Sequence, residues 1–379
     1  MKNIVRTFIF ISLLLVKFQA FAQANGKLQI HFIDVGQGDG ALLISPQGER
    51  VLFDDGALKY CDKPVAYLHE LGVKQIDYHI TSHYHSDHIG CCAQVLGDFP
   101  LQKDALDRGE NYNSSVFKSY LATIGEHRKT ADTNTVITLD AGSQHPVKIR
   151  VVAVNANGIH TANENDLSLD CVVQFDGFKA EIGGDLSGHD TPNYKDIETS
   201  VAPSVGIIDV YKVHHHGSSE STNEKWVETT KPSVAIISCG DGNTYGHPTQ
   251  ECIDVLHRAS VRSYWTEQGN GVPPEPGMDV VGGSIVVEVA ANATTFTVSY
   301  KGNHTDTFSI HGSGTVVDRS TGTVTNTPSG VVNTFAWSMS KSSKVYHYTH
   351  CVYAKPDDSN WKQGSTPPDG RSLHAGCPK

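Results

Sequence analysis

Apolar residues along this chain follow two periods, one typical of strands and one typical of helices. Short runs that alternate between apolar and polar residues, or that are rich in β-branched and aromatic residues, are typical of β-strands. Such runs occur at 28–35, 41–44, 51–55, 75–81, 149–154, 171–182, 209–213 and 233–238. The segments 64–71 and 249–258 instead place apolar residues at helical spacing. Because strands and helices alternate as far as about residue 300, we expect an α/β fold whose sheets are covered by helices on the outside.

The first 22 residues have the pattern of a signal peptide. Lys2 and Arg6 give a charged start, the segment 8–16 is apolar, and residues 20–22 form a cleavage site of small residues. A membrane anchor is the alternative, but the apolar run is too short to span a bilayer comfortably and Lys17 interrupts it. We therefore expect an exported protein, periplasmic or extracellular, without stable membrane association.

Composition divides the remaining chain into three parts. Residues 27–302 contain the alternating strands and helices and are predicted to form one large domain. Serine, threonine and glycine dominate much of 303–334, which is typical of a linker or a loosely packed β segment. The tail 335–379 regains aromatic residues and contains His347, His350, Cys351, His374 and Cys377. This C-terminal module fits a small zinc site or, after export, a Cys351–Cys377 disulfide.

The charge balance restricts the partners that we expect. The chain has 30 basic and 41 acidic residues, so removing Lys2, Arg6 and Lys17 with the signal segment leaves 27 against 41, a net charge of −14. Proteins bind nucleic acids and anionic membranes through lysine and arginine. We therefore expect this acidic chain to be a poor general binder of either. A local basic groove would still allow nucleic acid as a substrate. All 8 cysteines follow the signal segment and permit disulfides, whose connectivity the sequence leaves open.

The strongest chemical signal is the segment 83–88, which has the pattern His-x-His-x-Asp-His. Neutral imidazole is the commonest metal ligand, and a neighbouring carboxylate suits zinc or manganese. The segment lies between the predicted strand 75–81 and a predicted helix from Gly90 onward. On such a loop, the first two histidines can point one way while the aspartate and the last histidine serve a second position. A histidine-rich surface loop is the alternative, and four ligand-type residues at this spacing argue against it.

Three later segments offer further ligands for a binuclear site. Asp185 follows two glycines at the end of a predicted strand, where a carboxylate can approach and bridge two cations. His214, His215 and His216 end another predicted strand, and His247 follows soon after. Taken alone, an aspartate after Gly-Gly is more often a turn residue and a triple histidine is often a surface feature. In this order and together with the first motif, they indicate a metal site.

Together these segments resemble the metallo-β-lactamase superfamily, and most of all the hydrolase domain of ComEC-type DNA-internalisation proteins and their free-standing secreted relatives. The matching segments are 32–39, 81–90, 163–169, 184–186, 213–218 and 245–248. They cover about residues 27–260 in the family's order. The resemblance implies a four-layer αβ/βα sandwich, with the metals at one edge between the sheets and a small C-terminal extension beyond it.

The resemblance also implies a role for each residue of the main motif. His83 and His85 would hold a first metal, and Asp87 and His88 would hold a second. Asp185 would bridge the two. The cofactor would be Zn²⁺, as one or two ions, with Mn²⁺ as an alternative.

The resemblance also implies roles for the later histidines of the chain. The last metal-binding histidine falls within the triplet His214, His215 and His216, and we predict His215, although residue parity along the strand does not decide among them. His216 and His247 would orient ligands or donate protons.

One feature departs from the wider superfamily. Many members have a further histidine-containing loop that completes the first metal site. The corresponding segment 163–169 matches the ComEC-type version, which lacks that histidine. We expect Asn165, Ser168 or water to complete the first site, and His160 is a less favoured ligand.

The predicted chemistry is metal-dependent hydrolysis. Metal coordination lowers the pKa of bound water to roughly 7, which gives a hydroxide nucleophile at neutral pH. Asp87 and Asp185 would orient this hydroxide, while His216 or His247 would protonate the leaving group. We favour a phosphodiesterase or nuclease-type activity on a small-molecule or phosphodiester substrate, with nucleic acid as one candidate.

Two other functions compete with this prediction. The same metals could attack a carbonyl carbon, as in a β-lactam or a lactone, because loops rather than the fold choose the substrate. True β-lactamases of the superfamily usually have the extra histidine loop, so this function ranks lower. A non-catalytic binding protein is the third candidate, and the intact set of predicted ligands argues against it.

Overall fold

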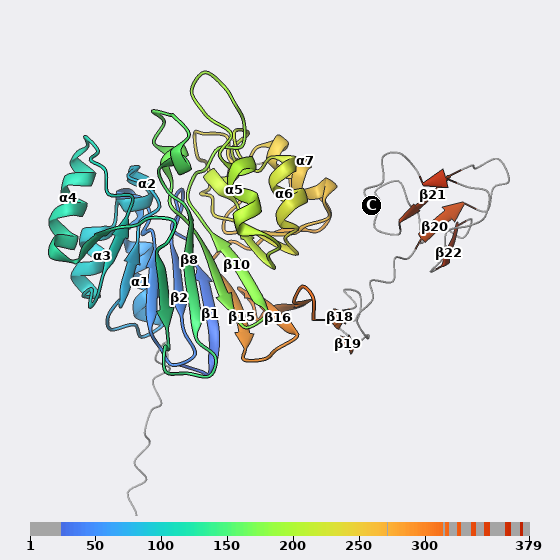
Figure 1. Cartoon of the computed structure of the whole chain (residues 1–379), viewed down its shortest axis with the longest axis horizontal. Coiled ribbons are helices and arrows are strands. Elements are labelled where there is room, and N and C mark those ends of the chain that lie inside the picture. Colours follow the sequence, from blue (N-terminus) through green and yellow to red (C-terminus); the bar gives the residue numbers. More distant parts are fainter. Residues whose placement is uncertain are drawn as a thin grey trace, which may run out of the picture.

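The computed structural model describes residues 24–313 except residue 271, together with six short strands beyond residue 313. Two large sheets pack face to face, and helices cover the outer side of each sheet (Figure 1). Their inner faces share one apolar cluster, which includes Phe178 of the second sheet and Phe296 of the first. The centroids of these two rings are 5.3 Å apart. The predicted αβ/βα sandwich is therefore confirmed.

The first sheet has nine strands in the order β17-β16-β15-β1-β2-β3-β4-β5-β6. It is antiparallel from β17 to β3 and parallel from β3 to β6. Its strands are β1 (Lys27–Phe32), β2 (Ala41–Ile44), β3 (Arg50–Phe53), β4 (Tyr78–Ile80), β5 (Ala105–Asp107), β6 (Arg128–Thr130), β15 (Ile285–Ala290), β16 (Thr295–Tyr300) and β17 (His304–Ser309).

The second sheet has eight strands in the order β14-β13-β12-β11-β10-β9-β8-β7. It is antiparallel from β7 to β10 and parallel from β10 to β14. Its strands are β7 (Val136–Leu139), β8 (Val147–Ala153), β9 (Asp170–Phe175), β10 (Phe178–Ile182), β11 (Val210–Lys212), β12 (Val234–Ile237), β13 (Arg262–Trp265) and β14 (Met278–Val280).

The helices form the two outer layers (Figure 1). On the first sheet these are α1 (Asp62–Glu70), α2 (Ser86–Ile89), α3 (Cys92–Asp98) and α4 (Ser115–Ile124), and on the second α5 (Glu198–Val205), α6 (Glu224–Thr230) and α7 (Gln250–Arg258). Ser114, Asn223 and Thr249 each accept a hydrogen bond from the backbone N–H three residues on, at the start of α4, α6 and α7. Such side chains satisfy N–H groups that the helix itself leaves without partners. Short 3₁₀ turns, η1 (Leu58–Tyr60), η2 (Gly125–His127), η3 (Asn155–Gly158), η4 (Asn165–Leu167) and η5 (His214–Gly217), connect these elements.

The first sheet continues past the domain boundary that the sequence predicts at residue 302. Strand β17 pairs with β16 over six residues, from Thr295 opposite Ser309 to Tyr300 opposite His304. Phe308 and Ile310 are buried in the core between the sheets. The polar composition of this segment reflects an edge strand, in which Phe308 is the one buried residue of six.

Six short strands follow residue 313. β18 (Thr315–Val317) pairs with β19 (Val324–Asn326), while β20 (Phe335–Ser338), β21 (Val345–Tyr348), β22 (Trp361–Gly364) and β23 (Ser372–Leu373) form a small sheet. Residues 1–22 and His350, Cys351, His374 and Cys377 lie outside the described residues. The expected signal peptide and C-terminal zinc site or disulfide therefore stay predictions.

A disulfide fastens the loop that contains the His-x-His-x-Asp-His motif. It joins Cys61, directly before α1, to Cys91, between α2 and α3, with their Cα atoms 5.1 Å apart. Among the described cysteines, Cys92, Cys171, Cys239 and Cys252 are buried free thiols. The bridge closes a chain segment of 30 residues, and it holds the end of the motif against the start of α1.

Replacing both Cys61 and Cys91 by alanine should lower the free energy of unfolding by about 2–4 kcal/mol, because the bridge restricts the unfolded chain. Urea denaturation under oxidising conditions measures this difference. In the presence of reductant, the native protein and the variant should unfold at nearly the same urea concentration. Equal stability under oxidising conditions would show that the bridge contributes nothing.

Candidate metal centre

The predicted metal ligands meet at one edge between the two sheets. His83, Asp185 and His215 are each the third residue after the end of a strand, namely β4, β10 and β11. Strands β10, β11 and β12 are parallel, so their carboxyl ends lie along the same edge of the second sheet. The carboxyl ends of such strands are where α/β proteins commonly bind ligands.

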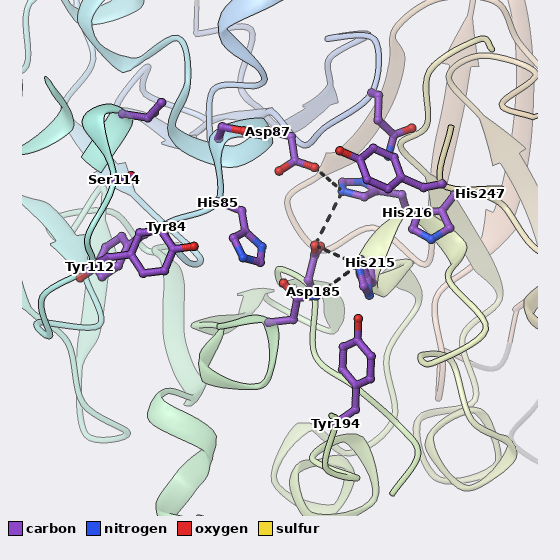
Figure 2. A pocket seen from close by; sticks show the side chains of 15 residues that line it. Tyr84, His85, Asp87, Tyr112, Ser114, Asp185, Tyr194, His215, His216 and His247 are labelled. Carbon is purple, nitrogen blue, oxygen red and sulfur yellow. Dashed lines mark hydrogen bonds and ion pairs between the residues drawn. The ribbon is translucent and has the colours of Figure 1, made fainter. Parts of the chain in front are cut away.

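A pocket of about 410 Å³ opens at this edge (Figure 2). Its lining comes from both halves of the sandwich and consists of Gln37, Tyr84, His85, Ser86, Asp87, Tyr112, Ser114, Val116, Asn165, Asp185, Tyr194, His215, His216, Tyr245 and His247. All four residues predicted to be catalytic, Asp87, Asp185, His216 and His247, are among them.

The first candidate position lies between His83, His85 and Asp185. His83 Nε2 is 3.0 Å from His85 Nδ1 and 3.7 Å from Asp185 Oδ2. One nitrogen or oxygen atom of each residue lies within 4.8 Å of the others, which is compact enough for one ion. Two imidazole nitrogens and a carboxylate oxygen are typical zinc donors.

The second candidate position lies on Asp185 as well, and its other donors come from α2 and η5. His88 Nε2 is 3.3 Å from Asp185 Oδ2. His216 Nε2 is 3.4 Å from Asp87 Oδ2 and 3.8 Å from Asp185 Oδ2, as the dashed lines in Figure 2 show. Asp185 therefore lies between the two positions, where a bridging ligand has to be.

The three consecutive histidines have different environments. His215 Nε2 is 3.7 Å from Asp185 Oδ2 and 3.2 Å from Asn165 Nδ2, so His215 does face the centre. His216 also faces it and is the one that contacts Asp87. Both residues have left-handed backbone angles, with φ of 50° and 56°. In a strand, neighbouring side chains point to opposite faces. The left-handed turn at His215 and His216 instead allows both rings to reach the same carboxylate, so residue parity along a strand does not predict the arrangement.

His214 points away from the pocket into a buried cluster that the sequence did not reveal. Its Nδ1 is 2.7 Å from Glu198 Oε1, and its Nε2 is 2.9 Å from Asp170 Oδ2 and 3.3 Å from Glu181 Oε1. All four side chains are fully buried. Glu198 also accepts hydrogen bonds from the backbone N–H groups of Thr222 and Asn223. The cluster therefore anchors η5 and the loop after it from beneath.

The donor atoms at the centre suit a cation. His88 Nε2, His216 Nε2 and Asp185 Oδ1 are buried and have no hydrogen-bond partner within the described part of the chain. A buried polar atom without a partner is costly, and buried charges are normally paired or bound to metals. Metal ions at the two positions would supply the missing partners.

The opposite nitrogens of these rings are held by other residues. His88 Nδ1 donates to Asp54 Oδ2 at 2.8 Å, and His216 Nδ1 donates to the carbonyl oxygen of Ser238 at 3.0 Å. Ser82 Oγ donates its only proton to Asp54, so it accepts from His83 Nδ1 at 3.1 Å. Each ring therefore has its Nε2 lone pair available toward the centre. A histidine that binds a metal usually donates its other N–H in this way.

Asp39 and Lys212 form a buried ion pair behind the second position. Asp39 lies 3.3 Å from His216 Nδ1 and 3.8 Å from His88 Nδ1, on the side of each ring that faces away from Asp185. The pair therefore orients the two imidazoles. Asp39 belongs to a motif that the sequence analysis identified, whereas the partnership with Lys212 joins residues 173 positions apart and has no local signal.

Two glycines allow the motifs to approach this closely. At Gly38, with a φ of 141°, an added Cβ would lie 2.3 Å from the carbonyl oxygen of Asp87. At Gly184, it would lie 2.6 Å from the Cβ of Ser82. Larger residues would push the His-x-His-x-Asp-His loop away from Asp39 and Asp185.

The charges at the centre interact strongly. Burial by itself would raise the pKa of Asp185, but His88, His215 and His216 hold it well below its ordinary value. Burial likewise opposes protonation of His216, yet Asp39 and Asp185 raise its pKa to about 10. Burial, followed by the nearby His216 and His215, lowers the pKa of His247 to about 3. The carboxylates of Asp39 and Asp185 thus favour positive charge at His216.

Asn165 and Ser168, which the sequence suggested for completing the first site, have different contacts. Asn165 lines the pocket, and its buried Oδ1 has no hydrogen-bond partner in the described structure, so it is available to an ion. Ser168 Oγ instead accepts from the backbone N–H of Asp185 at 3.0 Å and lies 3.4 Å from His83 Nδ1. Ser168 therefore positions the ligands. His160 is exposed and does not line the pocket.

Replacing Asp54 by asparagine should weaken zinc binding by about 10–100-fold, because the carboxylate that orients His88 is lost. The dissociation constant can be measured by competition with a chromophoric chelator. Asp140→Asn is the matched control, since Asp140 is also buried with a left-handed φ, of 53°, and accepts hydrogen bonds from Ser45 and Gln47 outside the pocket. Unchanged affinity in Asp54→Asn would contradict this role.

Comparison with known proteins finds sequence relatives over about three fifths of the chain. It is 27% identical over 262 residues to ComE operon protein 3 of Bacillus subtilis, which covers 64% of this chain and 32% of that protein. It is 28% identical over 238 residues to Recombination protein 2 of Haemophilus influenzae, which covers 61% of this chain and 26% of that protein. The chain thus matches about a third or less of the length of these relatives.

Solved structures give weaker matches, and no family model matches the chain. The metallo-β-lactamase fold protein YhfI from Bacillus subtilis aligns with a TM-score of 0.38 at 14% identity, over 60% of this chain and 93% of that one. MEM-A1, a subclass B3 metallo-β-lactamase from a soil metagenome, aligns with a TM-score of 0.35 at 16% identity, over 62% and 90%. By its sequence relatives and the donors gathered around Asp185, the chain is similar to ComEC-type proteins of the metallo-β-lactamase superfamily and has the residue set of a metal-dependent hydrolase.

Proposed function

We propose that this protein is an exported metal-dependent phosphodiesterase. The observation that carries the proposal is the position of Asp185, whose Oδ2 lies within 3.3–3.8 Å of Nε2 of His83, His88, His215 and His216. Two groups of donors thus share one carboxylate. Paired cations are well suited to phosphodiester hydrolysis because they contact both the attacking and the leaving oxygen.

The residues present fit divalent ions such as Zn²⁺ or Mn²⁺. His83, His85 and Asp185 would hold one ion, and Asp87, His88, Asp185 and His216 would hold another. His215 and Asn165 are the further donors within reach of the centre. When bound, such ions supply a water of lowered pKa and positive charge opposite the phosphoryl oxygens.

The protein's own groups then bind and orient the substrate. Asp87 and Asp185 are acceptors on the pocket wall and would align an attacking water. His247 lies with its ring centroid 5.2 Å from that of His215, and its Nδ1 has no hydrogen-bond partner in the described structure. We propose that His247, whose lowered pKa keeps the ring uncharged at neutral pH, hydrogen-bonds the substrate beside the leaving oxygen.

Export is supported by two features of the chain. One is the signal-peptide pattern of residues 1–22, and the other is the Cys61–Cys91 disulfide, because disulfides persist mainly in oxidising compartments. Within residues 24–313 and the short strands beyond them, no helix has both the length and the apolar character needed to cross a bilayer.

The zinc-loaded protein lacking residues 1–22 should hydrolyse bis(p-nitrophenyl) phosphate, and His83→Ala should reduce kcat/KM by about 100-fold or more, because one ligand of the first ion is lost. Release of p-nitrophenolate measures the reaction. His304→Ala, which changes an exposed histidine on edge strand β17, should keep the native rate. Nitrocefin should not be hydrolysed. Turnover of nitrocefin alone would replace this proposal with hydrolysis of a carbonyl substrate.

A further inference from the structure

The pocket at the metal centre contains tyrosines but neither lysine nor arginine. Among the 15 described residues that line it, four are tyrosines and none is lysine or arginine. A surface that binds a polyanionic strand needs several lysines or arginines to neutralise successive phosphates. The pocket has only the metal positions for that purpose, so its chemistry suits one phosphate group at a time.

Three of the tyrosines surround the centre on separate loops. Tyr112 precedes α4, Tyr194 lies between β10 and α5, and Tyr245 lies between β12 and α7. Tyr245 is 68% exposed, the highest value among the four exposed large apolar or aromatic residues of the described chain. Tyr112 and Tyr194 are half-buried. Single exposed apolar residues are common on protein surfaces, so Tyr245 is informative here because it lines the pocket.

Each of these three rings is next to a histidine of the centre. The ring centroids of Tyr112 and His85 are 6.0 Å apart, those of Tyr194 and His215 are 6.3 Å apart, and those of Tyr245 and His247 are 5.8 Å apart. Tyr245 is nearly parallel to His247, at 26°. In Figure 2, the hydroxyl end of Tyr194 points toward His215. A substrate whose phosphate is at Asp185 would therefore meet aromatic surfaces with its substituents.

The fourth tyrosine has a different role. Tyr84 is fully buried, its ring lies 4.4 Å from the guanidinium of Arg108, and its hydroxyl accepts from Arg128. Both arginines are also held by carboxylates, Arg108 by Glu164 and Arg128 by Asp107. These are internal ion pairs behind the pocket wall, so Tyr84 is part of the core and the arginines are committed elsewhere.

We propose that the site acts on a small phosphodiester that has a planar, nucleobase-like group next to the scissile bond, and that Tyr245 and Tyr194 provide the surfaces on which this group stacks. This inference rests on the proposed phosphodiesterase function. Bases stack on aromatic side chains without sequence preference, because every base has a flat π face. The pocket volume of about 410 Å³ lies in the range typical of small-molecule sites.

Three esters with the same leaving group test this specificity. The zinc-loaded protein is assayed with thymidine 5′-(p-nitrophenyl phosphate), with its abasic deoxyribose counterpart and with methyl p-nitrophenyl phosphate. All three release p-nitrophenolate, so differences in kcat/KM report only the other substituent. We expect the thymidine ester to exceed the other two by about 10-fold or more, within the range measured for stacking of one base.

Variants separate stacking from hydrogen bonding. In Tyr245→Ala and Tyr194→Ala the preference for the thymidine ester should fall severalfold, whereas Tyr245→Phe and Tyr194→Phe should keep it, because they retain the ring. Calorimetry provides a second readout: thymidine 5′-phosphate should bind more tightly than methyl phosphate, and Tyr245→Ala should remove the difference.

The outcomes distinguish the two proposals. Equal kcat/KM for all three esters would overturn the stacking inference and leave the phosphodiesterase function standing. Equal rates for the thymidine and abasic esters, both above the methyl ester, would show that the pocket recognises the sugar and not the base. Loss of preference in the phenylalanine variants would assign the tyrosines a hydrogen-bonding role instead. No turnover of any ester would overturn the phosphodiesterase function and this inference together.

Discussion

The convergence of four imidazoles on the buried carboxylate of Asp185 is the constraint on which this site depends. Nitrogen atoms of His83, His88, His215 and His216 all lie within 3.8 Å of its Oδ2. His88 and His216 already donate through Nδ1, while their Nε2 atoms and Asp185 Oδ1 have no hydrogen-bond partner in the described part of the chain, so cations would supply the missing partners. The two sheets, the loops after their strands and the glycines near Asp87 and Ser82 all serve to bring these atoms together.

A shell of buried polar residues keeps this geometry in place. Asp54 orients His88, the Asp39–Lys212 pair lies behind His88 and His216, and Glu198 anchors η5 through His214. Buried ion pairs of this kind are weak evidence for stability, because desolvation offsets their attraction. Their evident effect here is to fix ring orientation, which determines whether a metal site can form at all. The free-energy cost of burying these charged side chains is therefore linked to the metal site whose imidazole rings they orient.

Much of the fold and of the site could be predicted because its signals are local. The His-x-His-x-Asp-His segment directly follows a buried strand, and Asp185 directly follows another, so the sequence placed both at strand ends. The resemblance to metallo-β-lactamases implied that they meet at one edge. Strand alternation could not predict which of the three histidines face the centre, because the left-handed backbone angles of His215 and His216 interrupt the strand. Asp54 and Glu198 look like ordinary acidic residues in sequence, and their roles arise from contacts with residues 34 and 16 positions away. The sequence did not predict edge strand β17, because its outer face is polar.

The most direct test of the account is an anomalous difference map from crystals grown with zinc and measured at the zinc absorption edge. Two peaks should appear on either side of the Asp185 carboxylate, one within bonding distance of His83 and His85, and the other within bonding distance of Asp87, His88 and His216. A map without a peak at Asp185, or with its strongest peak in the buried cluster of Asp170, Glu181 and His214, would contradict the account.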